Sequence, residues 1–181
     1  EKRSEVFSLL DSLSKQGFSE SEVTAFRGKV LQALASQNDP TAKAAIAALD
    51  AVRGMPDEVA RTTNILSALA KDSSSELRQI QIASIQDKIL TGSGDITVLR
   101  KQALDAVSQL PADIQQAERM KLLTAIKDKD PVAKTALLVQ NYLDNAANLS
   151  VDDLALIEKM DPTLRSDALS VLGKFQQEFD Q

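Results

Sequence analysis

Residues 37–52 read QNDPTAKAAIAALDAV, and residues 128–143 read DKDPVAKTALLVQNYL. Both stretches contain the phrase D-P-x-A-K-x-A followed by Ile or Leu. The Asp can cap a helix because its carboxylate accepts hydrogen bonds from free backbone amides, and the Pro fits the first helical position because it has no amide hydrogen to leave unpaired. The repeated phrase therefore predicts the start of equivalent helices in two parts of the chain.

Composition and apolar spacing predict an all-α fold. The chain has 181 residues, 43% of them hydrophobic and only 3% aromatic, so Ala, Leu, Ile and Val supply most of the apolar mass. Ala and Leu favour helices. Apolar residues recur at helical spacing, and no run alternates with period two for long enough to form a strand.

Capping signals and apolar stripes together outline five helical segments before residue 91 and five after residue 95. Ser19 with Glu22, and Ser73 with Glu76, form capping boxes in which the Glu side chain reaches back to the cap. Further start signals are Pro56, Pro111, Ser150 with Asp153, and Asp161-Pro162. The stripes expected to face the core in the first half are Val6, Leu9, Leu10 and Leu13; Val23, Phe26, Val30 and Leu34; Ala42, Ala45, Ile46, Leu49 and Val52; Val59, Thr62, Leu66 and Leu69; and Leu77, Gln81, Ile82, Ile85 and Ile89.

The two sets of segments indicate a tandem duplication. Residues 91–95, TGSGD, are rich in glycine and small polar residues and are the best linker candidate. We therefore predict about ten helices in two similar five-helix units, residues 1–90 and residues 96–181, joined by 91–95. The competing interpretation is a chance likeness between Ala-rich helices.

The residue inventory excludes several kinds of chemistry. The chain has no His and no Cys, so it can form neither a Ser-His-Asp relay nor a thiolate nucleophile nor an ordinary zinc site. Acidic clusters such as Asp152-Asp153 stand at predicted helix starts, where carboxylates complement the helix dipole. We predict that the protein is not an enzyme and that it has no catalytic residue, metal or cofactor.

Charge and hydropathy narrow the choice of partner. The net charge is −5, which argues against nucleic acid as a partner because binding to phosphates needs a concentrated basic field. No segment approaches the roughly 20 apolar residues of a membrane span. A chain without Cys forms no disulfide, which is compatible with the cytoplasm and with secretion, so the sequence leaves the compartment open.

These exclusions leave a non-enzymatic protein–protein interaction module of adaptor or scaffold type, and a homo-oligomer is compatible with the same pattern. The candidate binding residues are the repeated Lys43 and Lys134, together with Arg53, Tyr142 and Phe179, which are residue types common at binding hot spots. For the two lysines, a solvated helix face or a shared salt bridge is the structural alternative. A helical bundle that binds a small ligand is an alternative function.

The stretch LLTAIKDKDPVAKTALLVQNYL, residues 122–143, resembles helices of the bacterial type III secretion gatekeepers and of some secreted effectors. The resemblance covers little of the chain. It implies, as a further alternative, a helical domain of a bacterial secreted or secretion-control protein that works by binding.

Overall fold

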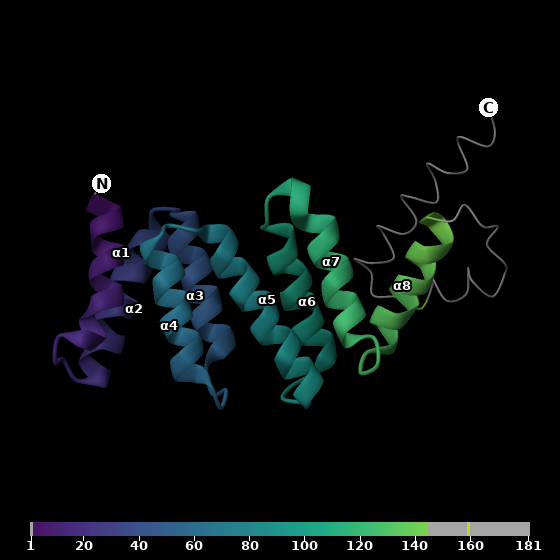
Figure 1. The fold of residues 1–181 in the computed structure, drawn as a ribbon, viewed down its shortest axis with the longest axis horizontal. Helices are drawn as coiled ribbons and strands as arrows, with labels where there is room; N and C mark the ends of the chain where they lie inside the picture. Colours follow the sequence, from purple (N-terminus) through teal and green to yellow (C-terminus); the bar gives the residue numbers. More distant parts are fainter. Residues whose placement is uncertain (1, 145–158, 160–181) are drawn as a thin grey trace. The chain divides into compact units, whose positions relative to one another are not determined.

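The computed structural model describes residues 2–144 and 159, and this part of the chain is all-α with no strand, as the sequence predicts (Figure 1). Eight α-helices and one short 3-10 helix follow one another: α1 (Lys2–Ser12), η1 (Leu13–Lys15), α2 (Glu20–Ser36), α3 (Pro40–Val52), α4 (Glu58–Ala70), α5 (Ser74–Thr91), α6 (Ile96–Ser108), α7 (Ala112–Ile126) and α8 (Pro131–Asp144). The last two predicted segments, with the start signals at Ser150 and Asp161, lie outside the described residues.

Local capping chemistry sets several helix starts where the sequence predicts them. The Ser19 hydroxyl accepts from the Glu22 amide at 3.2 Å, and the Ser73 hydroxyl accepts from the Glu76 amide at the same distance. The Asp39 carboxylate accepts from the amides of Thr41 and Ala42 at 3.0 and 3.2 Å, with Pro40 as the first residue of α3. These bonds satisfy amides that have no partner inside the helix.

The chain divides into two compact units, residues 1–115 and 116–181, with the division inside α7. The predicted linker is a tight connection between α5 and α6, which pack against each other. Gly92 takes a left-handed φ of 70° that ends α5, and the Asp95 carboxylate accepts from the Val98 amide at 3.0 Å to begin α6. The division into repeat units at residues 91–95 stays a prediction.

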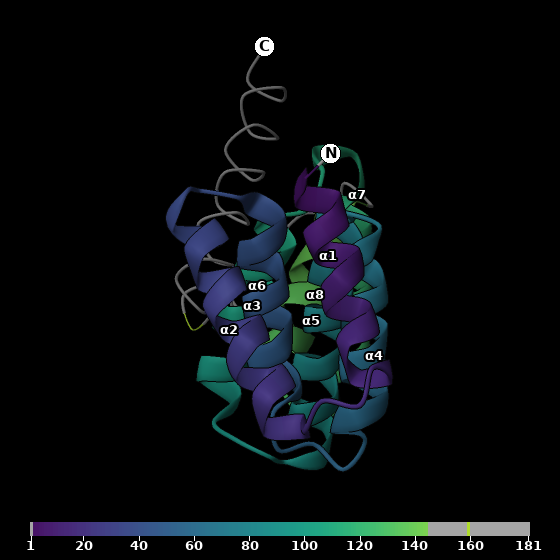
Figure 2. The same cartoon turned by 90° about the vertical axis from the view of Figure 1, so that its left-hand side faces the viewer.

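Helix α3 is the centre of the first unit. It packs against α2, α4 and α5, while α1 packs against α4 (Figures 1 and 2). Its buried residues are nearly all small: Thr41, Ala42, Ala44, Ala45, Ala48, Ala51 and Val52. Helix axes approach to about 8–10 Å depending on the side chains between them, so alanines on several faces let three neighbours come close at once.

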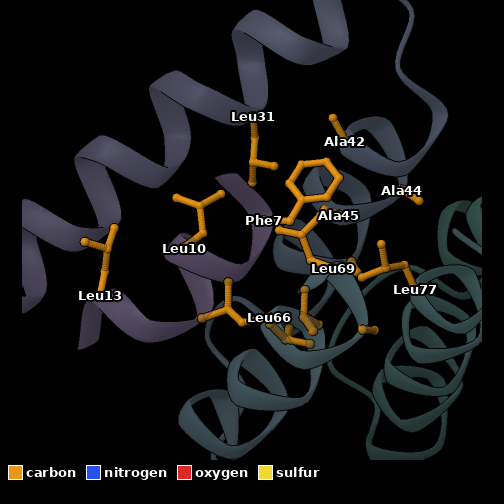
Figure 3. Packing of buried hydrophobic residues seen from close by; sticks show 14 of the residues in the cluster. Phe7, Leu10, Leu13, Leu31, Ala42, Ala44, Ala45, Leu66, Leu69 and Leu77 are labelled. Carbon is orange, nitrogen blue, oxygen red and sulfur yellow. The ribbon is translucent and has the colours of Figure 1, made fainter. Parts of the chain in front are cut away.

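Larger side chains from the surrounding helices fill the space around α3. Phe7 of α1 is fully buried and lies near Leu31 of α2 and Ala42 and Ala45 of α3 (Figure 3). The same cluster includes Leu10, Leu13, Val23, Ile65, Leu66, Ala68, Leu69 and Leu77. This connected apolar cluster is drawn from α1 to α5 and forms part of the core of the first unit, which also has buried apolar residues on α6.

Arg3 ties α1 to two loops at one end of this cluster. Its guanidinium donates to Asp39 at 3.0 Å and also to Asp72, and it lies 5.9 Å from the centre of the Phe7 ring. The hydrogen bond to Asp39 raises the pKa of Arg3 above its ordinary value. Asp39 therefore serves two partners: one oxygen caps α3 and the other holds α1.

Arg61 makes an equivalent tie between α4 and α5. It donates to Asp57 at 2.8 Å, to the Ser84 hydroxyl at 3.1 Å and to Asp87 at 2.5 Å. Burial lowers the pKa of Arg61, but its hydrogen bonds to Asp87 and Asp57 outweigh this effect and raise the pKa above the ordinary value. The cluster is a satisfied structural contact, because the Arg61 guanidinium donates to both carboxylates and to the Ser84 hydroxyl.

The prediction that every apolar stripe faces the core is wrong at three positions. Leu9 is 43% exposed, Phe26 is 46% exposed and Val59 is 75% exposed. Helical spacing places these residues on the apolar side of their helices, but no described neighbour covers them there. The other residues of the five stripes in the first half are buried or half-buried: even Gln81 is buried, and its side-chain carbonyl accepts from Arg78 at 3.1 Å.

In the second unit, the structure describes α7 from Gln116 onward, the connection to α8, α8 itself and residue 159. Leu122, Leu123 and Ile126 are buried on α7, and Ala133, Ala136 and Val139 are buried on α8. The Asp130 carboxylate accepts from the Val132 amide at 3.1 Å, so it caps α8 as predicted.

Replacing Asp39 should separate its two roles. Asp39→Ala removes the cap and the partner of Arg3, and we expect a loss of about 2 kcal/mol in the free energy of unfolding. Asp39→Asn keeps a side chain that caps well and should lose clearly less. Urea unfolding of both variants measures the difference, and equal losses would contradict the capping role.

Two apolar residues of α4 differ in burial, so replacing them with Ala should change the free energy of unfolding by different amounts. Leu69 is fully buried, so Leu69→Ala should cost about 2–5 kcal/mol of unfolding free energy. Val59 stands in the solvent, so Val59→Ala should change it by no more than about 0.5 kcal/mol. Urea unfolding again provides the test, and a large cost at Val59 would show that something covers this residue in solution.

Candidate functional site: an apolar groove at the α1–α2 turn

An apolar groove of about 400 Å³ lies where α1 turns through η1 into α2. Its walls come from the end of α1 and from η1 on one side, and from the first two turns of α2 on the other. The lining residues are Leu9, Leu13, Gln16, Phe18, Glu22, Val23 and Phe26. We call these seven residues the groove.

The turn itself explains why this end stays open. The helical stripe of α1 continues into η1, so Leu10 and Leu13 face the core while Leu9 faces outward. Phe18 precedes the cap Ser19 and Val23 is the fourth residue of α2, which are the positions of a hydrophobic staple. The staple explains why an apolar residue stands at 18, but it leaves the Phe18 side chain 52% exposed.

The groove gathers three of the large apolar side chains that are exposed in the described part of the chain. Leu9, Phe18 and Phe26 are each between 43% and 52% exposed. The remaining ones, Val59, Leu90, Val98 and Leu138, do not line it. Single exposed apolar residues are common on proteins, whereas a cluster around a hollow is a candidate for a binding surface.

Glu22 is the only charged residue among those that line the groove. The sequence predicts that its carboxylate closes the capping box, and this prediction is wrong. The Ser19 side chain accepts from the Glu22 amide, but the Glu22 carboxylate makes no hydrogen bond or ion pair with any described residue. Gln16 is engaged instead, since its amide donates to the Ser12 hydroxyl at 3.4 Å. Glu22 therefore offers an unpaired negative charge at the edge of an apolar surface.

The groove offers contact rather than chemistry. Its polar groups are one amide and one carboxylate, with no nucleophile beside a base. Across residues 2–144 and 159, no group of three acidic side chains is placed to hold a metal ion. None of the helices in the same part of the chain is long and apolar enough to cross a membrane.

Three of the binding residues predicted from the sequence, Lys43, Arg53 and Lys134, are described by the structure, and none of the three lines the groove. On α3, the exposed Lys43 donates to the side-chain amide oxygen of Asn38 at 3.1 Å, and at the far end of this helix Arg53 donates to Asp50 at 2.7 Å. Lys134 is exposed on α8. Tyr142 belongs to α8, but its side chain, like Phe179, lies outside what the structure describes. The role of all five residues in binding stays a prediction.

The groove residues have a weak signal in the sequence. The chain has only five Phe, and two of them, Phe18 and Phe26, stand eight positions apart around the start of one helix. Phe18 also stands outside the helix that it precedes, where a core role is less expected. The pattern does not reveal that Leu9 and Leu13 meet these residues across a turn, because that contact depends on the path of the loop.

The exposed and buried phenylalanines should differ sharply in their effect on stability. Phe7→Ala should cost about 3–5 kcal/mol of unfolding free energy because the ring is fully buried. Phe26→Ala should cost only about 1–2 kcal/mol because nearly half of the side chain is already in water. Urea unfolding measures both. A cost at Phe26 as large as that at Phe7 would mean that the groove is part of the core.

No protein-family model matches the chain, and neither a curated protein nor a solved structure matches it. The function of the groove therefore rests on its own geometry and chemistry.

Proposed function

We propose that the chain is a non-enzymatic protein–protein interaction module, of adaptor or scaffold type, and that a protein partner docks in the groove. One observation carries the proposal: Leu9, Phe18 and Phe26 stand half exposed around a single hollow. Aromatic side chains in a concave site are the usual anchors of protein recognition, because they bury a large area with few rotatable bonds.

The surrounding structure makes this surface rigid enough for docking. Leu13 and Val23 line the groove and also belong to the buried cluster around Phe7. A partner would therefore meet side chains whose backbone is already fixed by the core. Preformed sites lose less conformational entropy on binding than sites that must order first.

We also propose that the segment from α6 onward repeats the unit formed by α1 to α5. Asp39 and Asp130 cap α3 and α8 in the same way, and the residues three and six positions after each cap, Ala42 and Ala45 or Ala133 and Ala136, are buried. Two five-helix units would give about ten helices. The compact units divide at a different place, and the packing of α5 on α6 gives a physical reason for this.

A small apolar ligand is a second candidate for the groove, because a hollow of about 400 Å³ is large enough to hold one. Ligand sites usually bury some 70–90% or more of the ligand. Walls that remain about half exposed would leave much of a small molecule in water, so a partner that spreads over the rim fits better. The alternative of a bacterial secreted or secretion-control domain rests on residues 122–143 and stays a prediction.

The proposal predicts that binding and folding can be separated. We expect the double variant Phe18→Ala/Phe26→Ala to bind a protein partner about 30-fold or more weakly than the native chain does. Removing two central aromatic anchors commonly costs at least 2 kcal/mol of binding free energy. The matched control is Val59→Ala/Val98→Ala, which removes two exposed apolar residues outside the groove. Partners captured by the native chain are purified, and their Kd values for the three proteins are measured by calorimetry.

Circular dichroism first establishes that all three proteins are folded. Equal binding by the native chain and the groove variant would overturn the docking site. An equal loss of affinity in the groove variant and the control would assign binding to nonspecific hydrophobic association rather than to the groove.

A further inference from the structure

The groove identifies the kind of partner as well as the place where it docks. Resting on the proposed function, we propose that its occupant is an amphipathic helix of another protein, with an apolar stripe about two turns long. The stripe is flanked by a Lys or Arg that pairs with Glu22 and by an Asp or Glu that pairs with Lys29. Both charges lie on α2, which also forms one wall of the groove.

The dimensions of the groove favour a helix. The α2 residues that line it run from Glu22 to Phe26, about 6 Å at 1.5 Å per residue, and with Lys29 the same side of α2 spans about 10 Å. A helix that docks in a groove anchors residues at positions i, i+3 or i+4, and i+7, which also span about 10 Å. Three such anchors match the three half-exposed walls formed by Leu9, Phe18 and Phe26.

The same surface is poorly suited to an extended peptide. A strand binds by adding to a sheet edge, and residues 2–144 and 159 contain no strand that could offer one. The groove is lined by side chains, and its one side-chain amide, Gln16, already donates one of its two N–H groups to Ser12. An occupant that satisfies its own backbone hydrogen bonds is therefore favoured, and a helix does so.

Two charges on α2 favour one of the two orientations in which a helix could lie in the groove. Glu22, Phe26 and Lys29 are spaced i, i+4 and i+7, so they share one side of α2 with the groove. Glu22 and Lys29 are exposed, and neither side chain forms an ion pair among the described residues. A docked helix would thus meet a negative charge at one end of its apolar stripe and a positive charge at the other. Opposite charges in this order select one of the two directions in which the helix could lie.

A displayed library of helix-forming peptides, about 15 residues long, tests this inference on the full chain. We expect the native protein to enrich peptides with apolar residues at helical spacing and a basic residue at one end of the stripe. Glu22→Lys should replace that preference with Asp or Glu at the same peptide position. Lys29→Glu should instead change the preference at the opposite end, about seven positions away, which makes each variant the control for the other.

Affinities of the enriched peptides provide the second readout. In fluorescence anisotropy, a peptide selected by the native chain should bind Glu22→Lys about threefold to tenfold more weakly, and a peptide with the reversed charge should recover the loss. The Phe18→Ala/Phe26→Ala variant should lose peptides of both kinds. Equal binding of both charge patterns by the native chain and Glu22→Lys would overturn the charge assignment.

The remaining outcomes separate this inference from the proposed function. Extended or proline-rich peptides that need Phe18 and Phe26 would overturn the helical occupant while supporting the groove as a docking site. A native chain that dimerises in analytical ultracentrifugation, with a dimer lost in Phe18→Ala/Phe26→Ala, would assign the groove to a second copy of the chain. Enrichment that survives Phe18→Ala/Phe26→Ala would overturn both proposals.

Discussion

The first unit depends on the need to pack one helix against three others. Helix α3 contacts α2, α4 and α5, so it has little surface on which a large side chain could point away from a neighbour. Ala42, Ala44, Ala45 and Ala48 meet this constraint because a methyl group lets each neighbouring helix approach closely. The bulk of the core then comes from the outer helices, with Phe7 as the largest buried side chain. This division of roles explains why the stretch that begins at Asp39 decides the fold.

Asp39 links this packed centre to the helix that forms the groove. One carboxylate oxygen fixes the start of α3, and the other accepts from Arg3 near the start of α1. With Phe7 and Leu10 buried on the same helix, α1 has a fixed orientation, which turns Leu9 toward the solvent. The groove is thus a consequence of how the core positions α1, at the end of that helix where it turns toward α2.

The sequence predicts features that depend on residues close together in the chain, such as helix caps. It does not predict which helix faces are covered, because that depends on residues far apart in the chain. Caps at Ser19, Asp39 and Ser73 are confirmed because each bond joins residues two or three positions apart. Helical spacing also identifies the apolar side of each helix. Helical spacing does not reveal whether another helix covers that side. It therefore predicts Leu9 and Phe26 in the core, whereas both line an open groove. The groove forms only because the backbone of residues 13–19 brings the end of α1 beside the start of α2, and no local sequence pattern specifies that conformation.

The groove side chains are hard to explain by folding alone. Leu9, Phe18 and Phe26 each leave about half of their surface in water, so they contribute much less to stability than a buried residue of the same type. A cluster of exposed apolar residues also favours nonspecific association, which makes it a liability on a surface without a partner. In a chain that contains only five Phe and that builds its central helix from alanine, two aromatic rings at one open turn are an unusual use of large side chains. A partner that covers them would turn the exposed area into binding free energy, and Glu22 beside them would restrict which partner can do so.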